Sequence, residues 1–528
     1  MRPLSRRDVL RLVGAAAAAG GVGVPLIRGI GGASSTGTLL ASRLPLPRPF
    51  QRPLPVPDVL RPAPSGEYRI VQRAGTAEIL PGVRTAVWGY QGTFPGPTLV
   101  SRRGQPIVVR HRNELPVPTV VHLHGGHTPA ESDGYPTDLL YPIGTAEHAA
   151  HAGHHADPAA RIAIGERDYH YPMRQRAATL WYHDHRMDFT GPDVWRGLAG
   201  FHLVTDDEED RLPLPGGDRD LPLLIADRAF AADGSLAYPS RGVPTVPGVP
   251  TVPGVPTVPG VRAAYAAGVL GDVIVVNGVA WPYREVAAVR YRLRLLNASN
   301  ARRYRLALDP PPPGGSGFVQ IGTDGGLLDA PVRHDAVELA PAQRFDVVVD
   351  FGRYRPGTTV RLVNTFGAGS TRDVMQFRIT GRAADDSIVP DRLSADPVPD
   401  DPVPTDVTRT FRLRHDDVGG MTGWTINGRP FDPAVSIARA RLGRTEVWRL
   451  VSDFHHPIHL HLAPFRVLSR GIAGPGAYDH GWKDTIDLRP AEEARLLVRF
   501  DDYAGRFVLH CHNLEHEDMA MMATFTTT

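Results

Sequence analysis

Short runs of alternating apolar and polar residues recur along most of the chain. Clear examples are residues 106–110, 291–296 and 495–500, each bordered by Gly, Pro, Asn or Asp. Alternation with a period of two is typical of half-buried β-strands, because successive side chains point to opposite faces of a sheet. The pattern therefore predicts an all-β protein built from sandwiches or barrels.

Two polar, proline-rich connectors, near 206–220 and 383–406, divide the chain. The segments that they separate have a normal domain size, roughly 120–170 residues. We expect β domains at 66–207, 221–382 and 407–528, after a proline-rich lead at 34–65. Residues 242–259 contain three tandem copies of GVPTVP, which predict an extended surface insertion within the second domain.

The first residues have the features of an export signal. Residues 5–10 read SRRDVL, and an apolar stretch rich in Ala and Gly follows from 12 to about 27. This arrangement predicts a twin-arginine signal over 1–33, read by the twin-arginine translocation machinery. Pro25 and Arg28 interrupt the apolar stretch, which makes it a poor membrane anchor. We expect an exported protein without a stable anchor, either extracellular, cell-wall associated or periplasmic.

Charge and cysteine content exclude several functions. The 528 residues include 58 basic and 56 acidic side chains, for a net charge of +2, so no basic field indicates nucleic-acid binding. The single cysteine forms neither an internal disulfide nor a four-cysteine zinc site. The 22 histidines, in contrast, include several clusters, and these are the candidate metal-binding residues.

Eight of the histidines form four His-x-His pairs. Residues i and i+2 of a strand face the same side, so each pair directs two imidazoles to one place. Neutral imidazoles suit copper better than hard cations such as Mg²⁺. The pairs are His122 and His124, His183 and His185, His459 and His461, and His510 and His512.

Cys511 lies between two of these histidines and faces the opposite side of the strand. It can bind a different ion together with His456 and His516, and Met521 can be a weak axial ligand. Two imidazoles, a thiolate and a distant methionine form the blue-copper electron-transfer pattern. Taken singly, a His-x-His pair is more often structural and a buried Cys or Met is more often core. Four pairs together, with the only cysteine inside one of them, favour copper.

These residues resemble the ligands of the multicopper oxidases. The resemblance extends to TFPGPT at 93–98, RLLNAS at 294–299, IGTDGG at 321–326 and GWKDT at 481–485. The chain is most similar to the subgroup of spore-coat laccase, bilirubin oxidase and phenoxazinone synthase, an o-aminophenol oxidase, and 181–204 is most similar to the last. The resemblance implies three cupredoxin-like Greek-key β-sandwich domains, with a trinuclear copper cluster between the first and third.

The resemblance also implies roles for individual residues as ligands of four copper ions. Type 1 copper would be held by His456, Cys511 and His516, with Met521 axial. Type 2 copper would be held by His122 and His459. The type 3 pair would be held by His124, His183, His185, His461, His510 and His512.

The chemistry implied is the one-electron oxidation of a small aromatic reductant, phenolic or o-aminophenolic, coupled to reduction of dioxygen to water. Electrons would pass from Cys511 to the cluster through the two neighbouring histidines. Glu517 and Asp133 match acids implicated in this subgroup, which makes them candidate proton relays; a surface carboxylate is the alternative for each. Asp184, between two ligands, is expected to face away from the metal.

Three other functions remain open. A cuprous-ion oxidase for copper tolerance often carries methionine-rich segments, but this chain has eight Met and no such segment. A non-catalytic cupredoxin scaffold of the cell envelope would have lost ligands, whereas all are present here. A zinc hydrolase does not explain the His-Cys-His sequence.

The histidines at 148, 151, 154 and 155 form a separate insertion, either a solvated loop or an accessory copper site.

Overall fold

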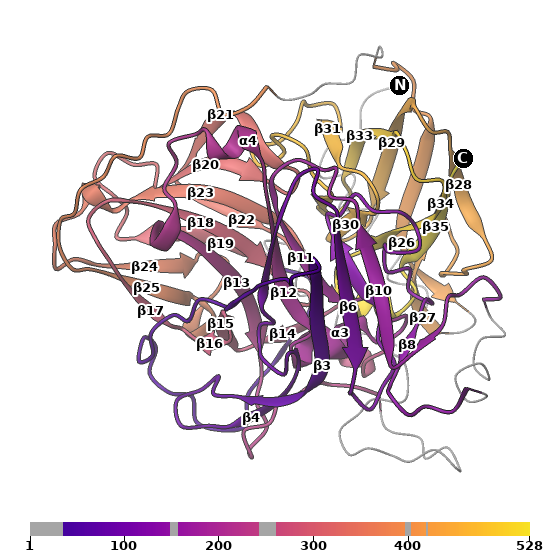
Figure 1. The fold of residues 1–528 in the computed structure, drawn as a ribbon, viewed down its shortest axis with the longest axis horizontal. Coiled ribbons are helices and arrows are strands. Elements are labelled where there is room, and N and C mark those ends of the chain that lie inside the picture. The colour runs from indigo at the N-terminus through magenta and orange to yellow at the C-terminus, as the bar shows by residue number, and fades with distance from the viewer. Residues whose placement is uncertain (1–34, 148–156, 242–259, 396–402, 419–420) are drawn as a thin grey trace, which may run out of the picture. The chain divides into compact units, whose positions relative to one another are not determined.

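The computed structural model describes residues 35–147, 157–241, 260–395, 403–418 and 421–528, and strands dominate this part of the chain (Figure 1). Its α-helices are short: α3 (Thr190–Arg196), α4 (Asp207–Asp210) and α5 (Leu514–Asp518). None of these helices is long and apolar enough to cross a membrane. The all-β prediction is confirmed, whereas the predicted signal, the GVPTVP repeats and the histidine-rich insertion lie outside the described residues.

The first sandwich has two sheets. One has the order β10-β6-β3-β4 and the other the order β2-β5-β12-β11-β7. Parallel pairs, such as β3 with β6 and β5 with β12, lie among antiparallel ones, so both sheets are mixed. The strands are β2 (Val59–Leu60), β3 (Glu67–Ala77), β4 (Thr85–Tyr90), β5 (Thr98–Arg102), β6 (Ile107–Asn113), β7 (Val121–His124), β10 (Glu166–Tyr171), β11 (Ala178–Asp184) and β12 (Ala199–Thr205).

The second sandwich has sheets of order β16-β15-β13-β18-β23-β20-β21 and β17-β25-β24-β19-β22. The first sheet comprises β13 (Asp220–Arg228), β15 (Val273–Val276), β16 (Val279–Ala280), β18 (Arg290–Asn297), β20 (Phe318–Thr323), β21 (Gly326–His334) and β23 (Arg344–Asp350). The second comprises β17 (Tyr283–Val286), β19 (Tyr304–Asp309), β22 (Ala336–Leu339), β24 (Thr359–Asn364) and β25 (Asp373–Ile379).

The third sandwich has sheets of order β27-β26-β29-β33-β31 and β28-β35-β34-β30-β32. The first comprises β26 (Arg409–Val418), β27 (Met421–Ile426), β29 (Arg444–Ser452), β31 (Phe465–Arg470) and β33 (Glu493–Phe500). The second comprises β28 (Ser436–Ala440), β30 (His456–Leu460), β32 (Thr485–Leu488), β34 (Gly505–Cys511) and β35 (Met522–Thr527). Two further pairs join β1 (Thr38–Leu40) to β14 (Val269–Gly271) and β8 (Leu140–Tyr141) to β9 (Ala163–Ile164).

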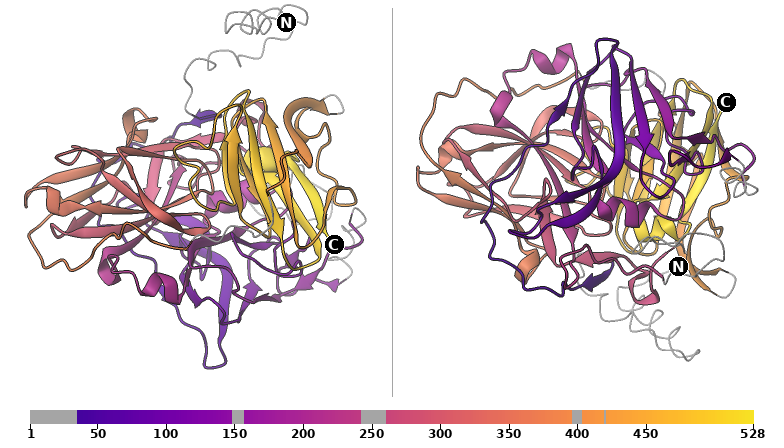
Figure 2. Two further views of the ribbon diagram at one scale, coloured as in Figure 1. Left: turned by 90° about the horizontal axis from the view of Figure 1, so that it is seen from above. Right: turned by 60° about the horizontal axis from the view of Figure 1, so that its bottom comes forward.

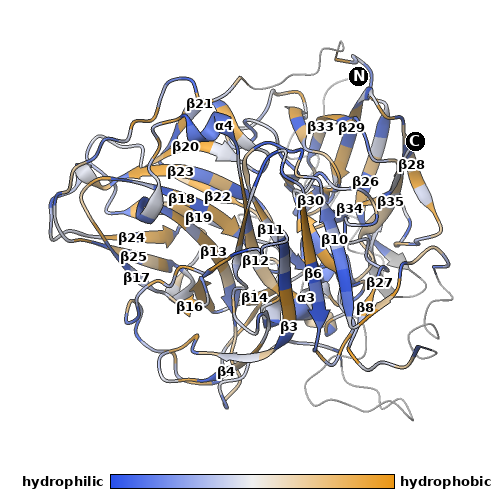
Figure 3. Ribbon diagram, in the orientation of Figure 1, coloured by the Kyte–Doolittle hydropathy of each residue, from blue (hydrophilic) through white to orange (hydrophobic). Residues whose placement is uncertain are grey.

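The sandwiches pack closely enough that Ser35–Thr528 form one compact unit (Figure 2). Apolar and polar residues alternate along much of strands such as β33 (Figure 3), and the apolar residues of β33 are the buried ones. The third sandwich has its own core around Trp448 and Phe525. The first sandwich also has an apolar core of its own, and its Trp181 and Phe201 pack in the same apolar cluster as Leu223 of β13. The first sandwich is therefore held firmly against the second.

A buried ionic group joins the first connector to the second sandwich. Arg292 and Arg294 of β18 both donate hydrogen bonds to Glu209 of α4, at 2.8 and 2.9 Å, and Arg292 also binds Asp346. Burial alone would raise the pKa of Glu209, but the two arginines outweigh it and hold the pKa at about 2. The carboxylate is therefore ionised at neutral pH and pairs with both cations.

Candidate metal centre

Two pairs of neighbouring strands bring the predicted histidines together. β7 and β11 are antiparallel neighbours in the first sandwich, with His122 opposite His183, and β30 and β34 are antiparallel neighbours in the third. Ring contacts connect the two pairs. His122 stacks on His461 at a centroid distance of 3.8 Å, and His124 stacks on His459 at 3.6 Å. The imidazoles therefore gather between the first and third sandwiches.

The eight histidines of the His-x-His pairs form one buried cluster, called here the eight-histidine cluster. Each is at most 1% exposed. Their nitrogen atoms converge in groups of three, within 4.8 Å of one another in each group. The groups are His122, His459 and His461; His124, His183 and His512; and His185, His461 and His510. These groups are compatible with the sequence-based ligand assignment.

Several ring nitrogens of this cluster have no hydrogen-bond partner. They include Nδ1 of His124, Nε2 of His183 and both nitrogens of His512. Elsewhere two nitrogens face each other, as do the Nε2 atoms of His461 and His510 at 3.2 Å. Buried polar atoms in native proteins are normally satisfied, so the unpaired nitrogens fit a site that receives a bound group. A soft or borderline cation satisfies converging imidazole lone pairs, and the residues present fit copper.

The electrostatics of the cluster also favour a cation. Burial, reinforced by neighbouring imidazoles, lowers the pKa of His183 to about 3. Burial lowers that of His185 to about 4. Burial likewise shifts the pKa values of His122, His124, His459, His461 and His512 well below the usual range. These rings are therefore neutral at physiological pH, and their lone pairs are available to a metal without loss of a proton.

His456, Cys511 and His516 form a second group, called here the cysteine set. The Cys511 sulfur lies 3.6 Å from Nδ1 of both histidines, and the two Nδ1 atoms are 3.1 Å apart. Nε2–H of His456 donates to Asp453 at 3.0 Å, and Nε2–H of His516 donates to the Ala267 carbonyl at 3.3 Å. Both Nδ1 atoms therefore direct a lone pair toward the sulfur, and the three atoms lie close enough together to hold one cation.

Met521, the predicted axial ligand, neighbours Cys511 through the backbone. It is fully buried in the same apolar cluster as Cys511, and its carbonyl oxygen accepts the Cys511 N–H at 3.0 Å. The ladder between β34 and the start of β35 thus holds this methionine beside the cysteine.

Trp424 covers the cysteine set and was not identified from the sequence. Its indole stacks on the His516 ring, with a centroid distance of 3.6 Å and an interplanar angle of 25°. The indole Nε1–H donates to the Ala266 carbonyl at 3.2 Å, which fixes the ring. Trp424 belongs to β27, and no local pattern in the sequence connects it to His516.

The two predicted acids lie against the eight-histidine cluster. Asp133 Oδ2 is 2.7 Å from Nδ1 of His461, and its backbone carbonyl binds Nδ1 of His122. Glu517 Oε2 is 3.1 Å from Nδ1 of His510. Burial raises the pKa of Asp133 well above its usual range. Burial acts the same way on Glu517, but His510 and His185 outweigh it and bring its pKa to about 2.

Asp184 does not point at the cluster. Its carboxylate accepts the backbone N–H groups of Val120 at 3.0 Å and Arg186 at 3.1 Å. It therefore holds the backbone around the His183 and His185 pair in place.

Asp484, in contrast, groups with His124 and His459. It was not assigned a role from the sequence, although it lies in the quoted GWKDT motif.

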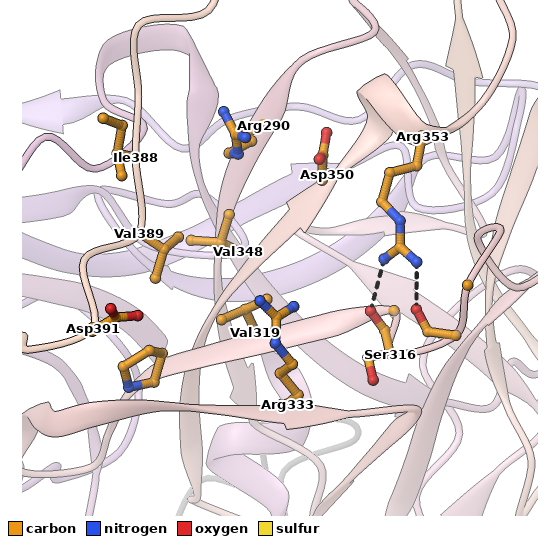
Figure 4. A pocket seen from close by; sticks show the side chains of 14 residues that line it. Arg290, Ser316, Val319, Arg333, Val348, Asp350, Arg353, Ile388, Val389 and Asp391 are labelled. Atoms are coloured by element: carbon orange, nitrogen blue, oxygen red, sulfur yellow. Dashed lines mark hydrogen bonds between the residues drawn. The ribbon is translucent and has the colours of Figure 1, made fainter.

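A cavity of about 350 Å³ reaches the cluster. His122, His459 and His461 line its inner part, and all three sandwiches contribute to its wall, including Gly126 and Asp324. Another cavity, of about 530 Å³, lies in the second sandwich (Figure 4). No histidine or cysteine lines it, and Arg353 there donates to the Ser316 carbonyl at 3.0 Å. Only the first of these two cavities gives small molecules a path to the metal-binding residues.

Comparisons with known proteins agree with this geometry. Two family models described as multicopper oxidase match residues 72–209 and 396–528. A laccase of Bacillus subtilis is 37% identical, over 91% of this chain and 98% of that protein. A bilirubin oxidase of Albifimbria verrucaria is 33% identical, over 91% of this chain and 81% of that protein.

Solved structures give the same result. The crystal structure of a multicopper oxidase from Pediococcus acidilactici aligns with a TM-score of 0.75 and 31% identity, over 92% of this chain and 93% of that one. The McoA multicopper oxidase of Aquifex aeolicus aligns with a TM-score of 0.73 and 29% identity, over 90% of this chain and 99% of that one. The predicted fold of three cupredoxin-like sandwiches is thereby confirmed.

Proton release should distinguish the two groups of residues when copper is added. Burial raises the pKa of the Cys511 thiol well above its usual range, so the thiol is protonated at neutral pH and must lose its proton to bind a metal. We expect the metal-free protein to release about one proton more per chain than the Cys511→Ser variant. Calorimetry at pH 7 in buffers of different ionisation enthalpy measures this difference. Equal release by both proteins would contradict the assignment of the thiolate as a ligand.

Proposed function

The chain belongs to the multicopper oxidase family and is a copper-dependent oxidoreductase with dioxygen as acceptor; on that premise we propose that it oxidises phenolic and o-aminophenolic compounds outside the cytoplasm. The observation that carries the proposal is the position of Cys511 between His510 and His512. The sulfur belongs to the cysteine set, and both neighbouring rings belong to the eight-histidine cluster. A few covalent bonds therefore join the place where electrons enter to the place where dioxygen is reduced.

The ligands proposed for copper are those named in the sequence analysis. His456, Cys511 and His516, with Met521 nearby, would hold one ion, and the eight-histidine cluster would hold three. Copper held there would take single electrons from a reductant and deliver four to dioxygen, which becomes two waters with four protons. The residues around these groups orient the ligands, exclude water and move protons.

Asp133 and Glu517 are proposed to move the protons. Their environments give them opposite tendencies, since the raised pKa of Asp133 favours a protonated carboxyl and the low pKa of Glu517 favours a carboxylate. Each touches a histidine of the cluster, so each can exchange a proton beside the reacting dioxygen. Pairs of acids with separated pKa values commonly divide donor and acceptor roles in this way.

The surroundings of His516 support an aromatic reductant. Trp424 stacks on the ring, and His415 and Phe454 lie against Trp424, with centroid distances of 4.6 and 5.9 Å. Aromatic faces favour contact with other aromatic rings.

The alternative reductant, cuprous ion, has less support in the sequence. The eight Met of the chain form no methionine-rich segment that would favour cuprous ion.

Oxygen uptake by the copper-loaded protein tests this proposal. We expect a blue thiolate band, and higher kcat/KM with o-aminophenol and a dimethoxyphenol than with bilirubin or Cu(I). The Cys511→Ser variant should lose both the band and the uptake, because it lacks the thiolate. Fastest turnover of Cu(I) would replace the proposal with a cuprous-ion oxidase, and a blue colour that survives Cys511→Ser would sink the copper assignment.

The relay is tested with Glu517→Gln. Glutamine keeps the size and polarity of the side chain beside His510, whose Nδ1 binds the Cys511 carbonyl, so copper should load normally. The amide, however, can neither take up nor release a proton. We expect dioxygen reduction to slow by about 10²-fold or more. Glu515→Gln is the matched control, because Glu515 is a buried acid on the same helix that binds Asn300 and Tyr238 instead of the cluster. A full rate in Glu517→Gln, with copper intact, would rule out the relay.

Export is proposed on the SRRDVL motif at residues 5–10. The only cysteine is buried and unpaired, so folding needs no oxidising compartment. Because the translocation machinery reads the arginine pair, we expect the Arg6→Lys, Arg7→Lys double variant to stay in the cytoplasm while Arg2→Lys is exported. Cell fractionation measures the distribution. Normal export of the double variant would exclude the twin-arginine route.

A further inference from the structure

A fully buried arginine of the second sandwich connects all three sandwiches beside the eight-histidine cluster. Arg344, at the start of β23, binds the carboxylate of Asp484 with both ends of its guanidinium, and the Nη1 contact measures 2.8 Å. Its Nε–H donates to the carbonyl of Thr179 in β11 at 2.9 Å. The remaining donors bind the carbonyl oxygens of Ala342 at 3.0 Å and Asp324 at 3.1 Å. One side chain therefore ties Asp484, in the third sandwich, to the other two.

Asp484 in turn contacts two histidines of the cluster. Its Oδ1 lies 3.1 Å from Nε2 of His124, and its backbone carbonyl lies 2.9 Å from Nδ1 of His459. Both oxygens accept hydrogen bonds, so each histidine carries its proton on the nitrogen that faces Asp484. The free lone pairs are then on Nδ1 of His124 and on Nε2 of His459. Nδ1 of His124 has no partner, and Nε2 of His459 lies 3.3 Å from Nε2 of His122.

Gly125 shows that the backbone is shaped around this ion pair. It follows His124 directly and has φ of +83°, a conformation that other residues rarely adopt. A Cβ atom at this position would lie 2.7 Å from Nη2 of Arg344 and 2.8 Å from Oδ2 of Asp484. The absence of a side chain therefore lets the ion pair approach the backbone of the His122–His124 pair.

A second ion pair supports the first from the other side. Lys483, the only lysine of the chain, is fully buried and lies 3.0 Å from Oδ2 of Asp324. The other oxygen of Asp324 accepts the backbone N–H of Arg344 at 2.7 Å. The IGTDGG and GWKDT motifs thus meet at Arg344. This contact explains why both belong to the family resemblance although neither contains an expected metal ligand.

We propose that Arg344 is a positioning residue for the metal cluster: through Asp484 it sets the direction and the tautomer of His124 and His459, so that each presents its lone pair to the metal. The inference rests on the proposed function, because it concerns copper bound at the eight-histidine cluster. Partners of this kind, which bind a ligating histidine from behind, typically change metal affinity or activity by about 10- to 100-fold when removed.

Arg344→Lys and Asp484→Asn test the proposal. Lysine keeps the charge but not the planar fork, and asparagine keeps the shape but not the carboxylate. We expect copper at the eight-histidine cluster to become about 10- to 100-fold easier to remove with a chelator. The blue band of the cysteine set should keep its intensity per chain, because neither residue touches that set. The electron paramagnetic resonance signal of the copper at the eight-histidine cluster should change as well.

Arg292→Lys is the matched control. Arg292 is also buried in the second sandwich and binds two carboxylates, those of Asp346 and Glu209, but no histidine. The variant should lose thermal stability without any change in chelator resistance. Asp484→Asn is nearly isosteric, so it gives a result even if Arg344→Lys does not fold.

The outcomes separate this inference from the proposed function. A wild-type protein that takes up copper without a blue band would remove the proposed function. With the blue band present, unchanged chelator resistance in Asp484→Asn or in folded Arg344→Lys would overturn the role of Arg344. Equal losses in Arg292→Lys would also overturn it, because they would show a general effect of destabilisation.

Discussion

The alternation of side chains around Cys511 is the constraint on which the rest of the structure depends. Neighbouring residues of a strand face opposite sides, so the sulfur faces the interior of the third sandwich while His510 and His512 face the first. One strand can therefore serve two metal-binding groups, but it can complete only one of them within its own sandwich. The other needs imidazoles from β7 and β11, so the first sandwich must dock against the third with its histidine strands at the junction.

That docking explains why so many charged groups are buried. Ion pairs such as Arg344 with Asp484 and Lys483 with Asp324 join two sandwiches and lose the solvation of both partners, and burying a pair of charges stabilises a fold little or not at all. Their value lies in geometry, since a misdocked sandwich would leave a charge unpaired in the interior. The cost of an unpaired charge therefore disfavours wrong docking. This keeps the sandwiches in the one arrangement in which the histidine nitrogens converge within a few ångströms. We infer that the second sandwich aligns the other two, in addition to separating them.

The sequence predicted the parts of the site that depend on local spacing. The four His-x-His pairs and the opposite orientation of Cys511 follow from the period of a strand, and the structure brings these residues together. Asp133 and Glu517 could be suggested only through the family resemblance. Arg344 and Asp484 lie 140 positions apart, and Trp424 reaches His516 from another sheet, so no local pattern reveals either contact. Their partners are determined by how the sandwiches pack.

On the proposed function, the cover over His516 limits how a reductant can deliver its electron. The imidazole is fully buried, Trp424 lies across one face, and the Ala267 carbonyl binds its outer nitrogen. The indole, which is itself only 2% exposed, and the backbone near Ala266 therefore shield the ring from a molecule in solvent. Electron transfer needs proximity but no bond, so such a site selects reductants by how closely a flat ring can approach and by their potential. A deep, shape-matched pocket beside His516 is therefore not required.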